Sequence, residues 1–174
     1  MKTKAIKALL AAVAFGAGTA FGADVAITAA NVEVVVAPDA PPVVLFAAEE
    51  LTNFLSQVLS GEIPVVRTPT AGKTAISLGA NAWTAADGID ASRLVRDAFT
   101  ITAGRGRVSI AGRDDAKADP HEAIFGRTTG VWSQHYERAT LFGVYEFLER
   151  YAGVRFYFPG ELGTIVPRKD RIVV

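Results

Sequence analysis

The chain has 174 residues, of which 50% are hydrophobic and 21% charged, so it can build one packed domain and is not globally disordered. Its 18 basic residues balance its 18 acidic residues, which removes a whole-molecule electrostatic reason to bind nucleic acid. It has no cysteine, which excludes disulfides, a lipid-anchored cysteine and thiolate metal sites.

The first 22 residues have the pattern of an export signal. Three lysines precede an apolar run over residues 8–20 that is too short and too rich in glycine for a comfortable membrane span. Small residues predict cleavage after Gly22, with cleavage after Ala20 or retention as an N-terminal anchor as alternatives. We therefore expect a signal peptide over residues 1–22 and a single domain over residues 23–174. The mature protein would be secreted or periplasmic by bacterial export, without membrane association.

The mature chain opens with a strand and a long helix. The β-branched run Asn31–Pro38 predicts a strand. Pro42 suits the first turn of the helix that follows, and Gly61 is expected to end that helix in the left-handed conformation. Apolar residues recur at steps of three and four along one face of this helix: Val44, Ala48, Leu51, Leu55, Val58 and Leu59.

Short strands dominate the middle of the chain. Residues 63–68 and 74–79 predict two strands joined by a loop with proline and glycine. A short helix is predicted near residues 92–95. The alternation over residues 98–112 predicts a β-hairpin with its turn at Gly104–Gly106.

The last third combines a long polar segment with a second amphipathic helix. Residues 113–137 show no period, and a loop of this length in a compact domain is usually functional. A helix follows up to Gly153, and Val154–Pro159 predicts a strand. Residues 171–174 are a last strand or the start of a linker. The apolar stripe of the helix that ends at Gly153 consists of Leu141, Val144, Tyr145, Leu148 and Ala152.

This order of elements predicts an α+β fold. About six strands would form one mainly antiparallel or mixed sheet, with two long helices packed on one face. The aromatic run Phe156, Tyr157 and Phe158 is too dense for one strand face. We expect one side of it to cover the helices, and the other to leave an exposed apolar patch in the isolated domain.

Four blocks of the sequence carry a resemblance to a known domain. They are AAEELTNFLSQVLSGEIPVV, ISLG, FTITAGRGRVSIAGRDD and, as the most specific, RATLFGVYEFLERYAGVRFYFPGELGTIVP. In these blocks the chain resembles the non-catalytic α+β domain that precedes the (β/α)8 barrel in several glycoside hydrolases. These include α-glucuronidases and family-20 β-N-acetylhexosaminidases. The resemblance covers residues 32–174, nearly the whole mature chain.

The resemblance implies an accessory domain of an exported, carbohydrate-degrading glycoside hydrolase. The barrel that carries the catalytic carboxylates is absent from these residues, so a fragment without catalytic residues is expected. The missing barrel is then the partner of this domain, with polysaccharide as a further ligand. The alternative is a free-standing secreted module that binds carbohydrate or another protein. Such enzymes share this front domain, so the resemblance does not name the sugar.

The sequence shows no motif for a catalytic site, a cofactor or a metal. Paired carboxylates hydrolyse glycosides at separations of about 5–9 Å, but the acidic pairs here are adjacent or helical and predict solvated surface. The stretch HEAIF at residues 121–125 lacks the second histidine of a zinc-protease helix, since Phe125 stands in its place.

The best binding candidates lie in the loop before the last helix. Sugars stack on aromatic rings and use planar polar groups for their hydroxyls, and Arg127, Trp132, Gln134, Tyr136 and Arg138 offer both. The resemblance places this loop near the barrel, so these residues are expected to contact sugar or the barrel. Packing onto the surface of the domain itself is the alternative, and Arg138 would then cap backbone groups.

Overall fold

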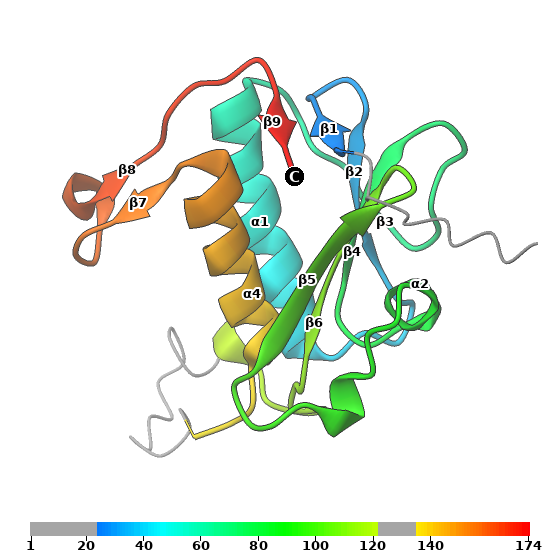
Figure 1. Ribbon diagram of the computed structural model, residues 1–174. Coiled ribbons are helices and arrows are strands. Elements are labelled where there is room, and N and C mark those ends of the chain that lie inside the picture. Colours follow the sequence, from blue (N-terminus) through cyan, green and yellow to red (C-terminus); the bar gives the residue numbers. More distant parts are fainter. Residues whose placement is uncertain (1–23, 122–134) are drawn as a thin grey trace, which may run out of the picture.

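The computed structural model describes residues 24–121 and 135–174 (Figure 1). The predicted signal peptide and residues 122–134 therefore lie outside the described part. The elements in chain order are β1 (Ala26–Ile27), β2 (Val32–Val36), α1 (Pro42–Leu59), β3 (Val65–Val66), β4 (Thr74–Leu78), α2 (Ala82–Ala86), η1 (Ala91–Arg93), β5 (Phe99–Gly104), β6 (Arg107–Gly112), α4 (Ala139–Phe147), η3 (Leu148–Ala152), β7 (Arg155–Phe156), η4 (Glu161–Gly163), β8 (Thr164–Ile165) and β9 (Ile172–Val173).

A mixed sheet of five strands in the order β3-β2-β4-β6-β5 forms the centre of the fold. Strand β2 is parallel to both β3 and β4, and β4 is parallel to β6. Only β5 is antiparallel to its neighbour β6 in this sheet, through the predicted hairpin. Both long helices lie on the same face of the sheet (Figure 1). The α+β fold class is thus confirmed, with the sheet of the mixed kind.

Helix α1 begins at Pro42, as predicted, because a residue without an N–H loses no hydrogen bond in the first turn. Its end differs from the prediction. Ser60, not Gly61, takes the left-handed conformation, with φ of 54°. Gly61 is needed for close packing instead, since a Cβ at this position would lie 2.7 Å from the Cβ of Ala29.

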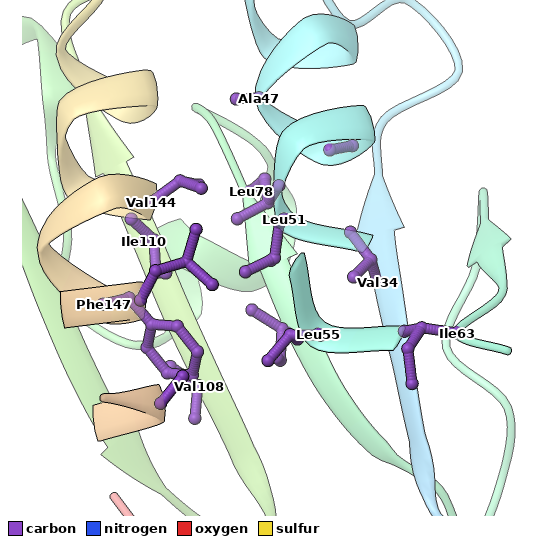
Figure 2. Packing of buried hydrophobic residues seen from close by; sticks show 14 of the residues in the cluster. Val34, Ala47, Leu51, Leu55, Ile63, Leu78, Val108, Ile110, Val144 and Phe147 are labelled. Atoms are coloured by element: carbon purple, nitrogen blue, oxygen red, sulfur yellow. The ribbon is translucent and has the colours of Figure 1, made fainter. Parts of the chain in front are cut away.

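The core fills the space between the two long helices and the sheet (Figure 2). Leu51 and Leu55 of α1 are fully buried, as are Val144 and Phe147 of α4. They pack with side chains from every second position of the strands, because successive residues of a strand point to opposite faces. The strand residues in this cluster are Val32, Val34, Val36, Ile76, Leu78, Val108 and Ile110.

The last helix continues past α4 as the wider turn η3 and ends at Gly153, which has φ of 82°. The predicted end of this helix is therefore confirmed. The helical turn predicted near residues 92–95 is the single 3-10 turn η1, slightly earlier in the chain. In the part of the chain that the structure describes, no helix is both long and apolar enough to span a bilayer.

The first and last residues of the described chain pair with each other. Strands β1 and β9 are antiparallel, with Ile27 opposite Ile172. Val25 and Val174 exchange two backbone hydrogen bonds of 2.9 and 3.1 Å. Of the two alternatives for residues 171–174, the last strand is therefore correct. Ile27 and Ile172 are buried, so this pair covers one end of the core.

Candidate functional site

The most specific block of the sequence, near the C-terminus, builds a small closed hairpin. Strands β7 and β8 pair antiparallel, and Figure 1 shows them projecting from the helix layer away from the sheet. The N–H of Tyr157 donates to the carbonyl of Gly163 at 2.8 Å. A Cβ at Gly163 would lie 1.9 Å from the carbonyl oxygen of Phe158, so only glycine allows this closure.

Phe156 anchors this hairpin on the outer side of both long helices. Its ring meets Phe54 of α1 edge-on at 5.2 Å between centroids, and Tyr145 of α4 edge-on at 5.3 Å. The hydroxyl of Tyr145 donates to Glu50 Oε2 at 2.6 Å, which ties α4 to α1. Burial and this carboxylate raise the pKa of Tyr145, so the phenol stays protonated and keeps donating.

The other large apolar side chains of the hairpin face solvent. Tyr157 is 68% exposed, Phe158 57%, Leu162 94% and Ile165 55%. We call these four residues the apolar tip. The exposed patch predicted beside the aromatic run is therefore confirmed. Within residues 157–165 the only charged residue is Glu161, and the exposed Arg155 lies directly opposite Ile165 in the hairpin. A solvent-exposed surface of this composition is typical of an interaction site, because the centres of interfaces are rich in aromatic residues and poor in charged ones.

The predicted sugar or barrel contacts fall into two groups. Arg127, Trp132 and Gln134 lie outside the described residues, so their role stays a prediction. Tyr136 is 9% exposed and belongs to the core cluster. The guanidinium carbon of Arg138 lies 5.0 Å from the centre of the Tyr136 ring, and it also lies over Phe142. The structure thus brings Tyr136 and Arg138 together as a stacked pair.

Several carboxylates that could be considered for glycoside hydrolysis are bound to neighbours of their own. Glu49 Oε2 lies 2.8 Å from Nε2 of His121, and Glu50 accepts from Tyr145. Asp115 accepts two backbone N–H groups of the turn that follows it. Glu146 lies on the helix surface beside Arg150. These local partners explain the acidic pairs as parts of the fold and its surface.

Asp114 holds the first turn of α4 to the end of β6. Its carboxylate accepts from both the N–H and the hydroxyl of Thr140, and that hydroxyl accepts from the N–H of Gly112 at 3.1 Å. A negative charge is favourable at this end of a helix, where backbone N–H groups lack partners. Burial nevertheless raises the pKa of Asp114, and the Thr140 hydrogen bonds offset part of that effect.

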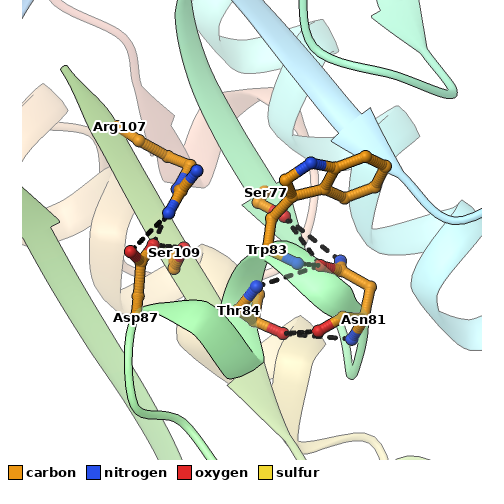
Figure 3. A network of polar contacts seen from close by, with 7 residues as sticks. All are labelled: Ser77, Asn81, Trp83, Thr84, Asp87, Arg107 and Ser109. Atoms are coloured by element: carbon orange, nitrogen blue, oxygen red, sulfur yellow. Dashed lines mark hydrogen bonds and ion pairs between the residues drawn. The ribbon is translucent and has the colours of Figure 1, made fainter. Parts of the chain in front are cut away.

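The opposite face of the sheet carries a polar network that the sequence reasoning missed (Figure 3). Asn81 caps the short helix α2 through Trp83 and Thr84, and it also contacts Ser77 of β4. After α2, Asp87 receives two hydrogen bonds from Arg107 and one from Ser109. The network therefore fastens α2 across strands β4 and β6.

Acid should weaken the fold through Asp87. The hydrogen bond from Arg107, together with that from Ser109, lowers the pKa of Asp87 below its ordinary value. A lowered pKa in the folded state contributes stability above the ordinary pKa of an aspartate, about 3.9, and this is lost as the pH falls through the folded value. Denaturant unfolding at pH 3 to 7 should show this loss. In Asp87→Asn the free energy of unfolding should fall less between pH 7 and pH 3 than in the wild type. An equal fall in both proteins would contradict the stabilising role of the Asp87 carboxylate.

A hollow of about 440 Å³ lies beside this network, between α2 and η1. Its polar side chains are already engaged, since Asn81 caps α2 and Asp90 caps η1 through Ser92. The hollow is therefore explained by how the loop 79–92 closes. In residues 24–121 and 135–174, no three histidine, aspartate or glutamate side chains gather as metal ligands.

Comparison with known proteins finds a likeness in structure rather than in sequence. No family model matches the chain, and no curated protein matches it. A solved structure of a family GH115 4-O-methyl-α-glucuronidase, described as specific for decorated arabinogalactans, is similar with 17% identity and a TM-score of 0.48. The match covers 86% of this chain but only 18% of the enzyme chain, so this chain spans less than a fifth of that enzyme. A likeness at this level does not establish an activity.

Proposed function

We propose that this chain is the accessory N-terminal domain of an exported, carbohydrate-degrading glycoside hydrolase, without catalytic activity of its own. A (β/α)8 barrel would supply the catalytic carboxylates. The observation that carries the proposal is the C-terminal block, which has the most specific resemblance to such domains. The same block builds an exposed apolar tip on a hairpin that is anchored by Phe156.

Two further features support an accessory role. The sheet and the two long helices form the α+β arrangement that the resemblance implies. The carboxylates Glu49, Glu50 and Asp114 contribute to packing and helix capping through His121, Tyr145 and Thr140. A glycosidase needs two carboxyl groups free to meet the bond that is cleaved.

The reading frame past Val174 tests this proposal directly. We expect the frame to continue and to encode a (β/α)8 barrel with an acid pair at the carboxyl ends of its strands. A frame that continues into an unrelated domain, or that stops at once in independent isolates, would overturn the proposal.

The exposed rings of Tyr157 and Phe158 favour a second candidate, a free-standing module that binds polysaccharide, because sugars stack on exposed aromatic faces. Affinity electrophoresis of the mature chain in gels that contain xylan or arabinogalactan tests this. The module would be retarded, and Tyr157→Ser would abolish the retardation. As an accessory domain the chain should migrate equally with and without polysaccharide.

A further inference from the structure

We propose that strand β5 is an interaction surface at which a second copy of this chain pairs edge to edge. Strand β5 is the last strand of the central sheet, in the order β3-β2-β4-β6-β5 (Figure 1). Its inner side pairs with β6, and among the described residues no strand lies along its outer side. An unpaired edge of this kind carries a row of backbone N–H and carbonyl groups that a further strand can bind.

The backbone groups of Phe99, Ile101 and Ala103 point away from β6. The carbonyl of Ile110 in β6 accepts from the N–H of Gly79 on the β4 side, so Ile110 turns its backbone away from its β5 partner, Ile101. Such non-hydrogen-bonded positions alternate with hydrogen-bonded ones along an antiparallel pair. Phe99 and Ala103 lie two residues before and after Ile101, so all three present their N–H and carbonyl groups at the free edge.

The two edges of the sheet differ in how well they are protected against pairing. The other edge strand, β3, has only two residues, and Pro64 directly precedes it. Short strands, proline and charged side chains are the usual protection of a sheet edge. Strand β5 has the six residues FTITAG, without proline or charge, and its register with β6 is continuous. The β5 edge therefore keeps the features that favour pairing with another strand.

This edge is complementary to itself in an antiparallel arrangement. A two-fold axis at Ile101 places Ile101 opposite its own copy and Phe99 opposite Ala103, so the outward-facing groups pair in about six hydrogen bonds. The same axis places Asp97, just before the strand, opposite Arg105 in the turn after it. Both side chains are exposed, and Asp97 has a contact of 3.7 Å with the neighbouring arginine. Opposite charges would therefore meet at both ends of the paired strands.

The hydroxyl of Thr102 gives an independent reason for pairing at this edge. Its Oγ1 is buried and has no hydrogen-bond partner in the part of the chain that the structure describes. Buried polar atoms nearly always have such a partner. In the register around Ile101, Thr102 stands opposite Thr100 of the second copy as a close, non-hydrogen-bonded pair, in which threonine hydroxyls bond across strands. A rotation about χ1 would bring the Thr102 hydroxyl to this position.

A second copy suits this edge better than a flexible peptide does. In each copy β5 is already ordered by β6 through the tight turn at Arg105 and Gly106, where both residues have positive φ. Pairing of two such strands orders little further backbone, whereas a flexible segment loses the conformational freedom of every residue that it adds.

Sedimentation equilibrium of the mature chain, residues 23–174, tests the pairing, with Arg105→Glu as the variant. Arg105 is exposed in the turn, so reversing its charge should leave the fold intact and place like charges at both ends of the dimer. We expect the wild type to dimerise and Arg105→Glu to raise the dissociation constant roughly fivefold. Adding Asp97→Lys should restore the wild-type constant. A wild type that stays monomeric up to about 1 mM, or a double variant without rescue, would overturn the inference.

Single cysteines test the register, since the chain has no cysteine of its own. Ile101→Cys places two thiols across the axis with Cα atoms about 5.5 Å apart, within reach of a disulfide. Thr100→Cys is the matched control on the same strand, because its two copies would be offset by two residues and lie about 8 Å apart.

In a glutathione redox buffer we expect Ile101→Cys to form a covalent dimer roughly tenfold faster than Thr100→Cys, because only the first pair has disulfide geometry. Equal rates would contradict the register and overturn the inference. A wild-type dimer that Leu162→Glu dissociates would assign self-association to the apolar tip and overturn it as well.

Discussion

Phe147→Ala is expected to lower the free energy of unfolding by about 3–5 kcal/mol. Phe147 is 0% exposed and lies where α4 meets the sheet, close to Val108 in Figure 2. Removing its ring takes away apolar contacts and leaves a cavity that the surrounding core can only partly fill. Equilibrium unfolding in urea, followed by far-UV circular dichroism, measures the change.

The control for this prediction is Val95→Ala. Val95 is 73% exposed, so its truncation should change the free energy of unfolding by less than about 0.5 kcal/mol. The slope of unfolding against urea should be the same in both variants, because neither changes the surface that unfolding exposes by much. A loss below about 1 kcal/mol for Phe147→Ala would show that α4 does not pack on this face of the sheet.

Thr140→Val is expected to cost about 2–4 kcal/mol, although the two side chains have nearly the same shape. The hydroxyl of Thr140 accepts from Gly112 and donates to Asp114, and Thr140 is 0% exposed. Valine therefore leaves a buried N–H without an acceptor and removes one donor from a buried carboxylate. Losing that donor raises the pKa of Asp114 further, so the loss should be larger at pH 7 than at pH 3.

Thr140→Ser is the conservative variant that separates the hydroxyl from the shape of the side chain. Serine keeps the oxygen and loses one methyl group, so it should restore most of the stability that valine loses. The measurement is urea unfolding of both variants at the two pH values. Equal losses for valine and serine would show that packing, rather than the bond to Asp114, decides the contribution of Thr140.

The long elements could be predicted from the sequence because their signals are local. Pro42 and the apolar period identified α1, Gly153 marked the end of the last helix, and the alternation around Gly104–Gly106 identified the β5–β6 hairpin. The exposed tip was also predictable, since a strand cannot bury three consecutive rings against one layer. Each of these signals depends on neighbours within a few residues.

The features that the sequence did not reveal depend on partners far apart in the chain. Asp87 bonds to Arg107, 20 residues further along the chain, and Asp114 bonds to Thr140, 26 residues further along. Neither pair leaves a pattern in the sequence. The short helix α2 did have a signal, because Asn81 and Thr84 have the spacing of a capping box. A helix of five residues is too short to show an apolar period.

Helix α1 shows why a glycine near a helix end does not fix the end itself. Gly61 has the expected residue type for a left-handed cap, yet Ser60 adopts that conformation. The competing requirement is the approach of the β1–β2 turn, where Ala29 leaves no room for a side chain at position 61. Tertiary packing here decides which of two adjacent residues changes conformation.

Hydrolysis of glycosides by the 174-residue chain and by the proposed longer form with a barrel distinguishes an accessory domain from an enzyme. The substrates are aryl glycosides and oligosaccharides that end in glucuronic acid or N-acetylhexosamine, incubated with equal molar amounts of both proteins. We expect turnover by the form that contains the barrel and none by the 174-residue chain. Robust turnover by the 174-residue chain, abolished by substituting one of its own carboxylates, would contradict it.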